Sequence, residues 1–397
     1  MVLFVVLSHI GLYANAETID AHSLHAGKAN NGYETALISV INAIQKQDLA
    51  FALQQVDAHL ASFPKSREGH LLRADILHAM SGALSGLGEH EVISAENLKK
   101  FKHQLNNRLK HTGAYADKTH SHIPANLVAL GQHKHVMVAD MTNGRLYLYK
   151  NNDGIPVLVR DYYLTIGSEG YGKEVEGDNR TPVGVYEINR YIEGKALPDL
   201  YGKGAFPVNY PNRYDRFLKR TGYGIWLHGT PSSTYARSPW ASEGCFVLSN
   251  DDLIDIGQYI SVAERTPVVL SDSIEWVNEE VYLERQSQYM AVINQWKQDW
   301  EGLDTSAYLQ HYSAKNFNFG KDNYQSWAKR KLNVNKAKTF VQLDFDIKSL
   351  FVYPGDKEMF VVRFKQKYLS NNYSGESEKE QYWEKDNDGQ WKIIYEG

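Results

Sequence analysis

Two neighbouring stretches of the chain decide its fold and its chemistry: Ile225-Trp226-Leu227-His228-Gly229-Thr230 and then Ser242-Glu243-Gly244-Cys245-Phe246-Val247-Leu248. The second stretch contains the only cysteine among the 397 residues. The first contains His228, the only histidine between His135 and His311. Cys245 and His228 are therefore the first pair to consider as a catalytic centre.

The residue types around this pair suit nucleophilic chemistry. A thiol becomes a strong nucleophile as a thiolate, and a neighbouring imidazole can take its proton and hold the resulting charge as an ion pair. The apolar run 224–227 predicts a buried strand that ends at His228. Gly244 allows a sharp bend before Cys245, so main-chain N–H groups near these two residues can face an oxyanion. The sequence predicts a cysteine nucleophile with a histidine base.

The order of these motifs resembles the YkuD (L,D-transpeptidase) catalytic domain of bacterial cell-wall enzymes. His-Gly-Thr, a loop, Ser-x-Gly-Cys and the helix start Asn250-Asp251-Asp252-Leu253 carry the resemblance. Upstream, 136–140 and 145–149 resemble the opening hairpin of the family, and Thr-Pro-Val-Gly at 181–184 matches its Thr-Pro-x-Gly turn. The resemblance covers roughly residues 130–272. It implies that the carbonyl of Gly229 orients His228.

Two positions depart from the family pattern. Many members read Ser-His-Gly-Cys-x-Arg, whereas this chain has Glu243 and Val247 at the His and Arg positions. The missing arginine puts the usual support of the cysteine loop in doubt but leaves the nucleophile and base in place.

Further residues are expected to bind the substrate. Tyr223, Trp226, Ser242 and Arg237 are predicted to line the groove, together with Trp240, and the aromatic stretch 195–214 is a plausible lid beside His228. Arg237 is the best candidate to hold a substrate carboxylate. A solvated surface arginine is the alternative.

The alternatives for the cysteine are an inert buried thiol and half of a zinc site. The chain has no second cysteine and no HExxH motif. The pairs His120-x-His122 and His133-x-His135 lie in another segment and are interpreted as solvated linker histidines. We therefore expect no metal and no cofactor.

The first residues and the overall charge indicate where the protein acts. Residues 1–16 begin with an apolar run and end in Ala-x-Ala, which predicts a secretory signal peptide rather than a transmembrane segment of the mature chain. An exported protein with one cysteine has a free thiol in an oxidising compartment, which favours a functional role. We expect the periplasm or cell wall. The net charge of −4 gives no indication of nucleic-acid binding.

Composition and periodicity predict a multidomain α+β protein in three parts. Residues 17–126 read as a helical N-terminal region of one or two hairpins, serving either docking and dimerisation or as a cap on the catalytic domain. Residues 127–275 read as a mainly-β YkuD catalytic domain with short strands and turns. Residues 281–397 read as an α+β cone that resembles the SnoaL-like, nuclear-transport-factor-type fold. Pocket binding, homodimerisation and plain structural support all remain open for this last domain.

This arrangement is similar to that of the cell-shape L,D-carboxypeptidases of helical and curved bacteria. The resemblance implies that peptidoglycan stem peptides are the substrate and that a Cys245 thioester is formed on tetrapeptide stems with loss of the terminal D-Ala. Transfer to an amine, strict L,D-carboxypeptidase trimming and a non-catalytic peptidoglycan-binding scaffold are the three functions to be distinguished.

Overall fold

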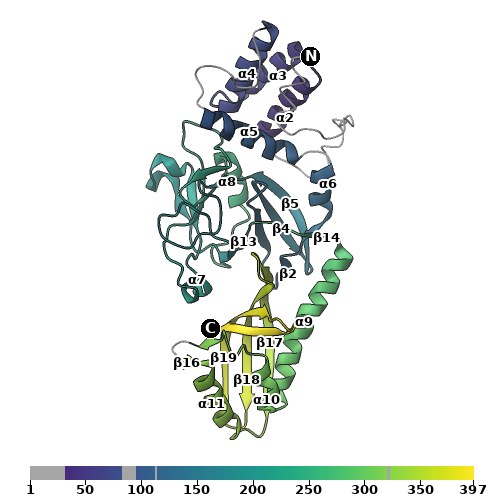
Figure 1. Ribbon diagram of the computed structural model, residues 1–397, viewed down its shortest axis with the longest axis vertical. Helices are drawn as coiled ribbons and strands as arrows, with labels where there is room; N and C mark the ends of the chain where they lie inside the picture. Colours follow the sequence, from purple (N-terminus) through teal and green to yellow (C-terminus); the bar gives the residue numbers. More distant parts are fainter. Residues whose placement is uncertain (1–31, 83–94, 112–113, 320–321) are drawn as a thin grey trace.

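The computed structural model describes residues 32–82, 95–111, 114–319 and 322–397. The signal peptide predicted at 1–16 lies outside these ranges. Figure 1 shows an elongated molecule with the N-terminal helices at one end, the catalytic domain in the middle and a helix-covered sheet at the other end. The fold class predicted from the sequence is confirmed.

The N-terminal region is helical, as its periodicity predicts. Its helices are α2 (Gly32–Gln45), α3 (Leu49–Ser62), α4 (Arg67–Met80), α5 (Ala95–Lys110) and α6 (Ala114–Ser121). Asp48 and Ser66 cap α3 and α4 by accepting hydrogen bonds from the N–H groups of Phe51 and Gly69. The apolar faces of these helices form one core that includes Tyr33, Leu37, Val56 and Leu72.

The segment around His120, interpreted from the sequence as a solvated linker, is largely the helix α6. The histidines are not solvated linker residues: His120 Nε2 lies 3.8 Å from Asp161 Oδ1, and the ring of His135 packs edge-on against Tyr259. Both segments pack on the catalytic domain, since His120 of α6 approaches Asp161 and His135 begins a strand of the catalytic sheet.

The catalytic domain contains a five-stranded sheet in the order β5-β4-β3-β13-β7, a four-stranded sheet in the order β12-β10-β9-β8, and the pair β11-β6. The strands are β3 (His135–Asp140), β4 (Arg145–Asn152), β5 (Ile155–Tyr163), β6 (Ile166–Gly167), β7 (Gly184–Glu187), β8 (Ile192–Glu193), β9 (Gly204–Pro207), β10 (Trp226–His228), β11 (Trp240–Ser242), β12 (Phe246–Val247) and β13 (Pro267–Ser271). The helical segments are η2 (Gly194–Ala196), η3 (Asp199–Tyr201), α7 (Arg213–Phe217) and α8 (Asn250–Gly257). The hairpin predicted at Asn143-Gly144 joins β3 and β4.

The C-terminal domain wraps a long sheet around helices. Its elements are α9 (Glu279–Glu301), α10 (Thr305–Gln310), α11 (Tyr324–Asn335), β15 (Asn318–Phe319), β16 (Asp322–Asn323), β17 (Val341–Tyr353), β18 (Met359–Ser370), β19 (Tyr373–Lys385) and β20 (Trp391–Glu396). Strand β2 (Leu127–Ala129) precedes the catalytic sheet in sequence but pairs with β17. Strands β1 (Ile123–Pro124) and β14 (Trp276–Val277) pair beside it.

The sheet of this domain is buried on both faces where it meets the catalytic domain. Phe360, Val362 and Phe364 point into the aromatic core beneath α9, as the alternation in sequence predicts. The opposite face belongs to a core that also contains residues of β3, β4 and β13. The catalytic and C-terminal domains therefore share one hydrophobic core. Within the described ranges, no helix is long and apolar enough to cross a membrane.

Candidate active site

His228 and Cys245 lie on adjacent parallel strands. His228 ends β10, and Cys245 directly precedes β12, in a register that pairs His228 with Val247. Side chains two residues apart point to the same face of a strand, so strand geometry carried one residue beyond β12 predicts Cys245 on the face of His228. The structure thus brings the two predicted catalytic residues to one side of a small sheet.

The tautomer of His228 follows from its hydrogen bond. Nδ1 lies 2.7 Å from the carbonyl oxygen of Gly229. A carbonyl can only accept, so Nδ1 carries the proton and Nε2 is left with a lone pair. The ring of Tyr201 from η3 packs edge-on against the imidazole at 5.0 Å. The carbonyl of Gly229 and the ring of Tyr201 hold His228 as a neutral base.

The charge states of the pair differ from the ion pair expected from the sequence. Burial lowers the pKa of His228 to about 4, an effect that the Gly229 carbonyl opposes and the charge of Arg237 adds to. Burial raises the pKa of Cys245 to about 11, partly offset by the main chain of Trp226 and by Arg237. At neutral pH the resting pair is a thiol beside a neutral imidazole, because burial disfavours both charged forms.

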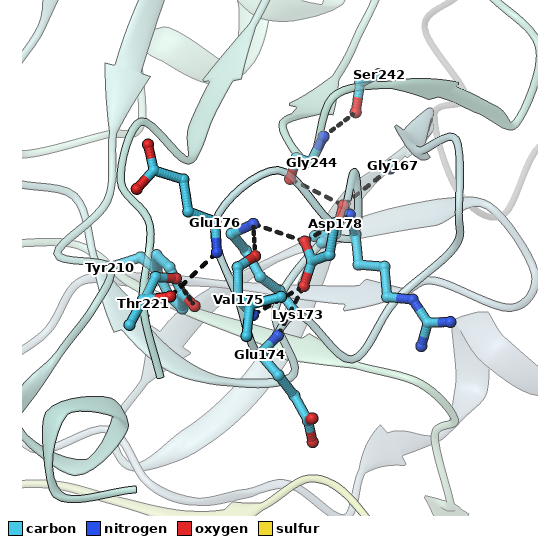
Figure 2. Close-up of polar contacts among 12 residues, drawn as sticks. Gly167, Lys173, Glu174, Val175, Glu176, Asp178, Tyr210, Thr221, Ser242 and Gly244 are labelled. Carbon is cyan, nitrogen blue, oxygen red and sulfur yellow. Dashed lines mark hydrogen bonds and ion pairs between the residues drawn. The ribbon is translucent and has the colours of Figure 1, made fainter. Parts of the chain in front are cut away.

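Hydroxyl groups hold residues 242–245, the cysteine loop. Ser242 Oγ donates to the carbonyl of Cys245 at 2.5 Å and accepts from the N–H of Gly244 at 3.1 Å. Thr181 Oγ1 donates to the carbonyl of Gly244 at 3.0 Å and accepts from the N–H of Gly167 at 2.9 Å (Figure 2). Ser242 was expected to bind substrate, but its buried hydroxyl is used within the loop. The N–H of Gly244 is likewise engaged, whereas the N–H of Cys245 and the main chain of Trp226, whose hydrogen bond lowers the pKa of the thiol, remain beside the sulfur.

The segment before Thr181 is itself held by a buried ion pair. Lys173 Nζ forms a 2.6 Å ion pair with Asp178, whose carboxylate also accepts from the N–H groups of Glu174, Val175 and Arg180 (Figure 2). Lys173 is buried, and its charge lowers the pKa of the Cys245 thiol. Val247, at the position of the usual arginine, is buried in β12.

Gly244 is required by its conformation and its surroundings. Its φ is +118°, and a Cβ atom there would lie 2.8 Å from the carbonyl oxygen of Arg180. The sharp bend predicted before the nucleophile is present.

The predicted substrate-binding residues are distributed around the sulfur. Cys245 Sγ lies 3.3 Å from the carbonyl oxygen of Gly224. Gly224, Tyr223 and Trp226 line a cleft of about 390 Å³ that also contains Arg190 and Tyr210. Tyr223 is 77% exposed and is free to contact a ligand. This cleft begins beside the nucleophile.

Arg237 lies in the loop between β10 and β11. Its guanidinium donates to the carbonyl of Ala241, and its charge lowers the pKa of both Cys245 and His228. It is half-buried rather than a solvated surface arginine. Tyr201, which the sequence indicated only as part of an aromatic lid, contacts Trp226 and His228. Among the described residues, no group of three or more His, Cys, Asp or Glu is placed to hold a metal ion.

Comparisons with known proteins agree with this geometry. Residues 134–270 match the L,D-transpeptidase catalytic domain (YkuD), and residues 288–397 match the Cds6 C-terminal NTF2-like domain. The chain therefore contains an L,D-transpeptidase-family catalytic domain followed by an NTF2-like domain, as the sequence resemblance implied.

Two solved structures have a similar arrangement. Bd1075 of Bdellovibrio bacteriovorus is 26% identical, with a TM-score of 0.61 over 70% of this chain and 97% of that one. The helical cell shape determining protein Pgp2 of Campylobacter jejuni is 26% identical, with a TM-score of 0.57 over 68% of this chain and 95% of that one. No curated protein matches the chain. The catalytic domain places the protein among peptidoglycan-modifying enzymes.

Proposed function

We propose that the protein is a cysteine acyltransferase of the L,D-transpeptidase class that cleaves the bond before the terminal D-Ala of peptidoglycan tetrapeptide stems. The observation that carries this proposal is the position of His228 at the end of β10 and of Cys245 directly before the paired strand β12, with Nε2 of His228 available as a base. Export to the periplasm or cell wall follows from the substrate and from the predicted signal peptide.

The first half-reaction forms a thioester. His228 Nε2 takes the thiol proton as Sγ attacks the carbonyl of the third stem residue, and the N–H of Cys245 stabilises the oxyanion by about 3 kcal/mol. The tetrahedral intermediate then breaks its C–N bond. His228 returns the proton to the leaving amine of D-Ala, and the acyl group stays on sulfur. Because the resting thiol is protonated, this proton transfer accompanies attack rather than preceding it.

The second half-reaction has two possible acceptors. Water gives a tripeptide, which is L,D-carboxypeptidase activity, and an amine of another stem gives a crosslink. Strict L,D-carboxypeptidase activity is the second candidate function. The likeness to a helical cell shape determining protein supports it. In both cases His228 deprotonates the acceptor as it attacks the thioester.

Incubation of the mature protein with disaccharide-tetrapeptide, with and without an added D-amino acid, tests the proposal by mass spectrometry. Tripeptide alone identifies a carboxypeptidase, and D-amino-acid exchange or crosslinked dimer identifies a transpeptidase. Cys245→Ala and His228→Ala are the matched inactive controls. Turnover that survives in Cys245→Ala refutes the mechanism.

A non-catalytic peptidoglycan-binding scaffold predicts a different result. A degenerate site would bind stem peptides without turnover and would acylate with a carbapenem no faster than a free thiol. Fast carbapenem labelling of Cys245 eliminates the scaffold.

A further inference from the structure

The helical N-terminal region lies outside both domain matches, which cover residues 134–270 and 288–397. It nevertheless packs against residues 230–241, which follow the His228-Gly229 pair, run into the first two residues of β11 and are named here the cleft loop. The sequence left two roles open for this region, docking or capping. The contacts with the cleft loop define a more specific role.

Aromatic contacts join α2 and α3 to the centre of the cleft loop. The rings of Tyr33 and Tyr235 stack at 4.1 Å with an interplanar angle of 13°. Phe63 packs edge-on against Tyr235 at 5.1 Å. Ala236 is 7% exposed and belongs to the core of the helical region rather than to that of the catalytic domain. The middle of the loop is therefore anchored in a different domain from its ends.

Polar and edge contacts extend this attachment along the loop. Lys65 Nζ donates to the carbonyl of Ser232 at 2.5 Å. His103 of α5 packs edge-on against Trp240 at 5.5 Å. The phenol of Tyr33 is itself fixed, because its hydroxyl donates to Glu68. The loop is thus held at three separate places between residues 232 and 240.

The helical region is in turn fixed to the catalytic sheet away from the loop. Glu34 Oε2 lies 2.8 Å from Arg145 of β4, and Glu34 Oε1 lies 3.4 Å from Arg108 of α5. The guanidinium of Arg108 covers the ring of Tyr163 at 3.8 Å. The charged side chains of Glu34, Arg108 and Arg145 are all 5% exposed or less. A buried network of this kind opposes sliding or detachment, because separation leaves charges unpaired.

The cleft loop carries Arg237, whose charge acts on both Cys245 and His228. We infer that the helical region braces the active site: Tyr33 and Lys65 are positioning residues that hold the cleft loop so that Arg237 stays beside Cys245 and His228. The inference adds an intramolecular role to the proposed function. It can be tested without peptidoglycan, because the single cysteine reports on its own surroundings.

The decisive experiment is a double-mutant cycle on full-length protein, measured as the rate of Cys245 alkylation by iodoacetamide at pH 8. Arg237→Gln removes a positive charge that lowers the pKa of the thiol, so it should reduce the thiolate fraction and slow alkylation by on the order of threefold. Lys65→Met, at an exposed side chain, should slow alkylation in the same direction by a smaller factor. The double variant should react no more slowly than Arg237→Gln alone, because Lys65 acts through Arg237.

Amide hydrogen exchange of residues 230–241 supplies a second readout. Tyr33→Ala should raise exchange in the cleft loop, whereas Tyr33→Phe, which keeps the stack, should not. Phe51→Ala is the matched control, since Phe51 is an aromatic residue of α3 that is 46% exposed. If Tyr33→Ala fails to fold, Lys65→Met still decides the outcome.

The activity assay separates this inference from the proposed function. On tetrapeptide, Lys65→Met and Tyr33→Ala should lower kcat/KM by on the order of tenfold, as expected when a group is misplaced in the site. An inactive wild type would refute the proposed function, while alkylation and exchange would still test the brace. Two results would overturn the inference. One is that Lys65→Met alkylates and exchanges at the wild-type rates. The other is that the double variant is slowed by the product of the two single-variant factors, which would mean that Lys65 does not act through Arg237.

Discussion

Thr181→Val is expected to loosen the cysteine loop while leaving the fold intact. The hydroxyl of Thr181 bridges two main-chain groups, the N–H of Gly167 and the carbonyl of Gly244, and the side chain is fully buried. Valine has nearly the same shape but leaves both groups without a partner. Each unsatisfied buried group costs about 1–3 kcal/mol, so the loss of two partners should lower the free energy of unfolding by about 2–6 kcal/mol.

The same substitution should reduce catalysis, because Gly244 directly precedes the nucleophile. We expect kcat on tetrapeptide to fall on the order of tenfold to a hundredfold with little change in KM, as a displaced sulfur affects attack more than binding. Thr181→Ser should recover most of the activity, since it restores the hydroxyl.

Thr266→Val provides the matched control. Thr266 is also buried and accepts a hydrogen bond from the N–H of Ser261 at 2.8 Å. Its loss should lower stability by about 1–3 kcal/mol without changing kcat. Chemical denaturation and initial rates measure both effects. Equal loss of kcat in the two variants, or full activity in folded Thr181→Val, would refute the assigned role of Thr181.

Three further outcomes follow from the charges in the structure. The acid limb of the pH–rate profile should have its midpoint near pH 4, because a base with its pKa lowered to about 4 is lost only below that pH; a midpoint near 6.5 would contradict it. The alkylation rate of Cys245 should keep rising towards a midpoint near pH 11, and a plateau by pH 9 would show that the thiol is not held protonated. Glu34→Gln should lower the free energy of unfolding by about 3–5 kcal/mol in denaturant titration, because Arg108 loses its buried ion-pair partner and Arg145 keeps only Asp161 at 3.3 Å; a change under 1 kcal/mol would show that these charges are solvated.

Local signals in the sequence predicted the elements that need only local information. The apolar run before His228, the glycine before Cys245 and the hairpin signal at Asn143-Gly144 are each properties of a few consecutive residues, and the structure has the strand, the bend and the hairpin. The alternation in β18 similarly predicted which side chains face the inner core.

Contacts between distant segments could not be predicted in this way. Thr181 supports Gly244 from 63 positions away, and Tyr33 stacks on a ring that lies in another domain. Arg363 alternates along β18 with the core residues Val362 and Phe364, yet its side chain is only 14% exposed and pairs with Glu187 of the catalytic domain at 2.7 Å. In each case the partner is determined by how distant segments pack together. Such packing leaves no periodic pattern of apolar residues in either segment.

The two departures from the family motif have separate physical consequences. Val247 is a buried residue of β12 and cannot donate a hydrogen bond from its side chain, and the described hydrogen bonds to the loop carbonyls come from the hydroxyls of Ser242 and Thr181. Glu243 is exposed, and its negative charge raises the pKa of the neighbouring Cys245. A carboxylate at this position disfavours a thiolate in the resting enzyme. Catalysis therefore depends on His228 to remove the thiol proton during attack. Glu243 in place of the family's histidine thus makes His228 more important as the base. The 2.7 Å hydrogen bond to Gly229, which fixes the tautomer of His228, is consistent with this role.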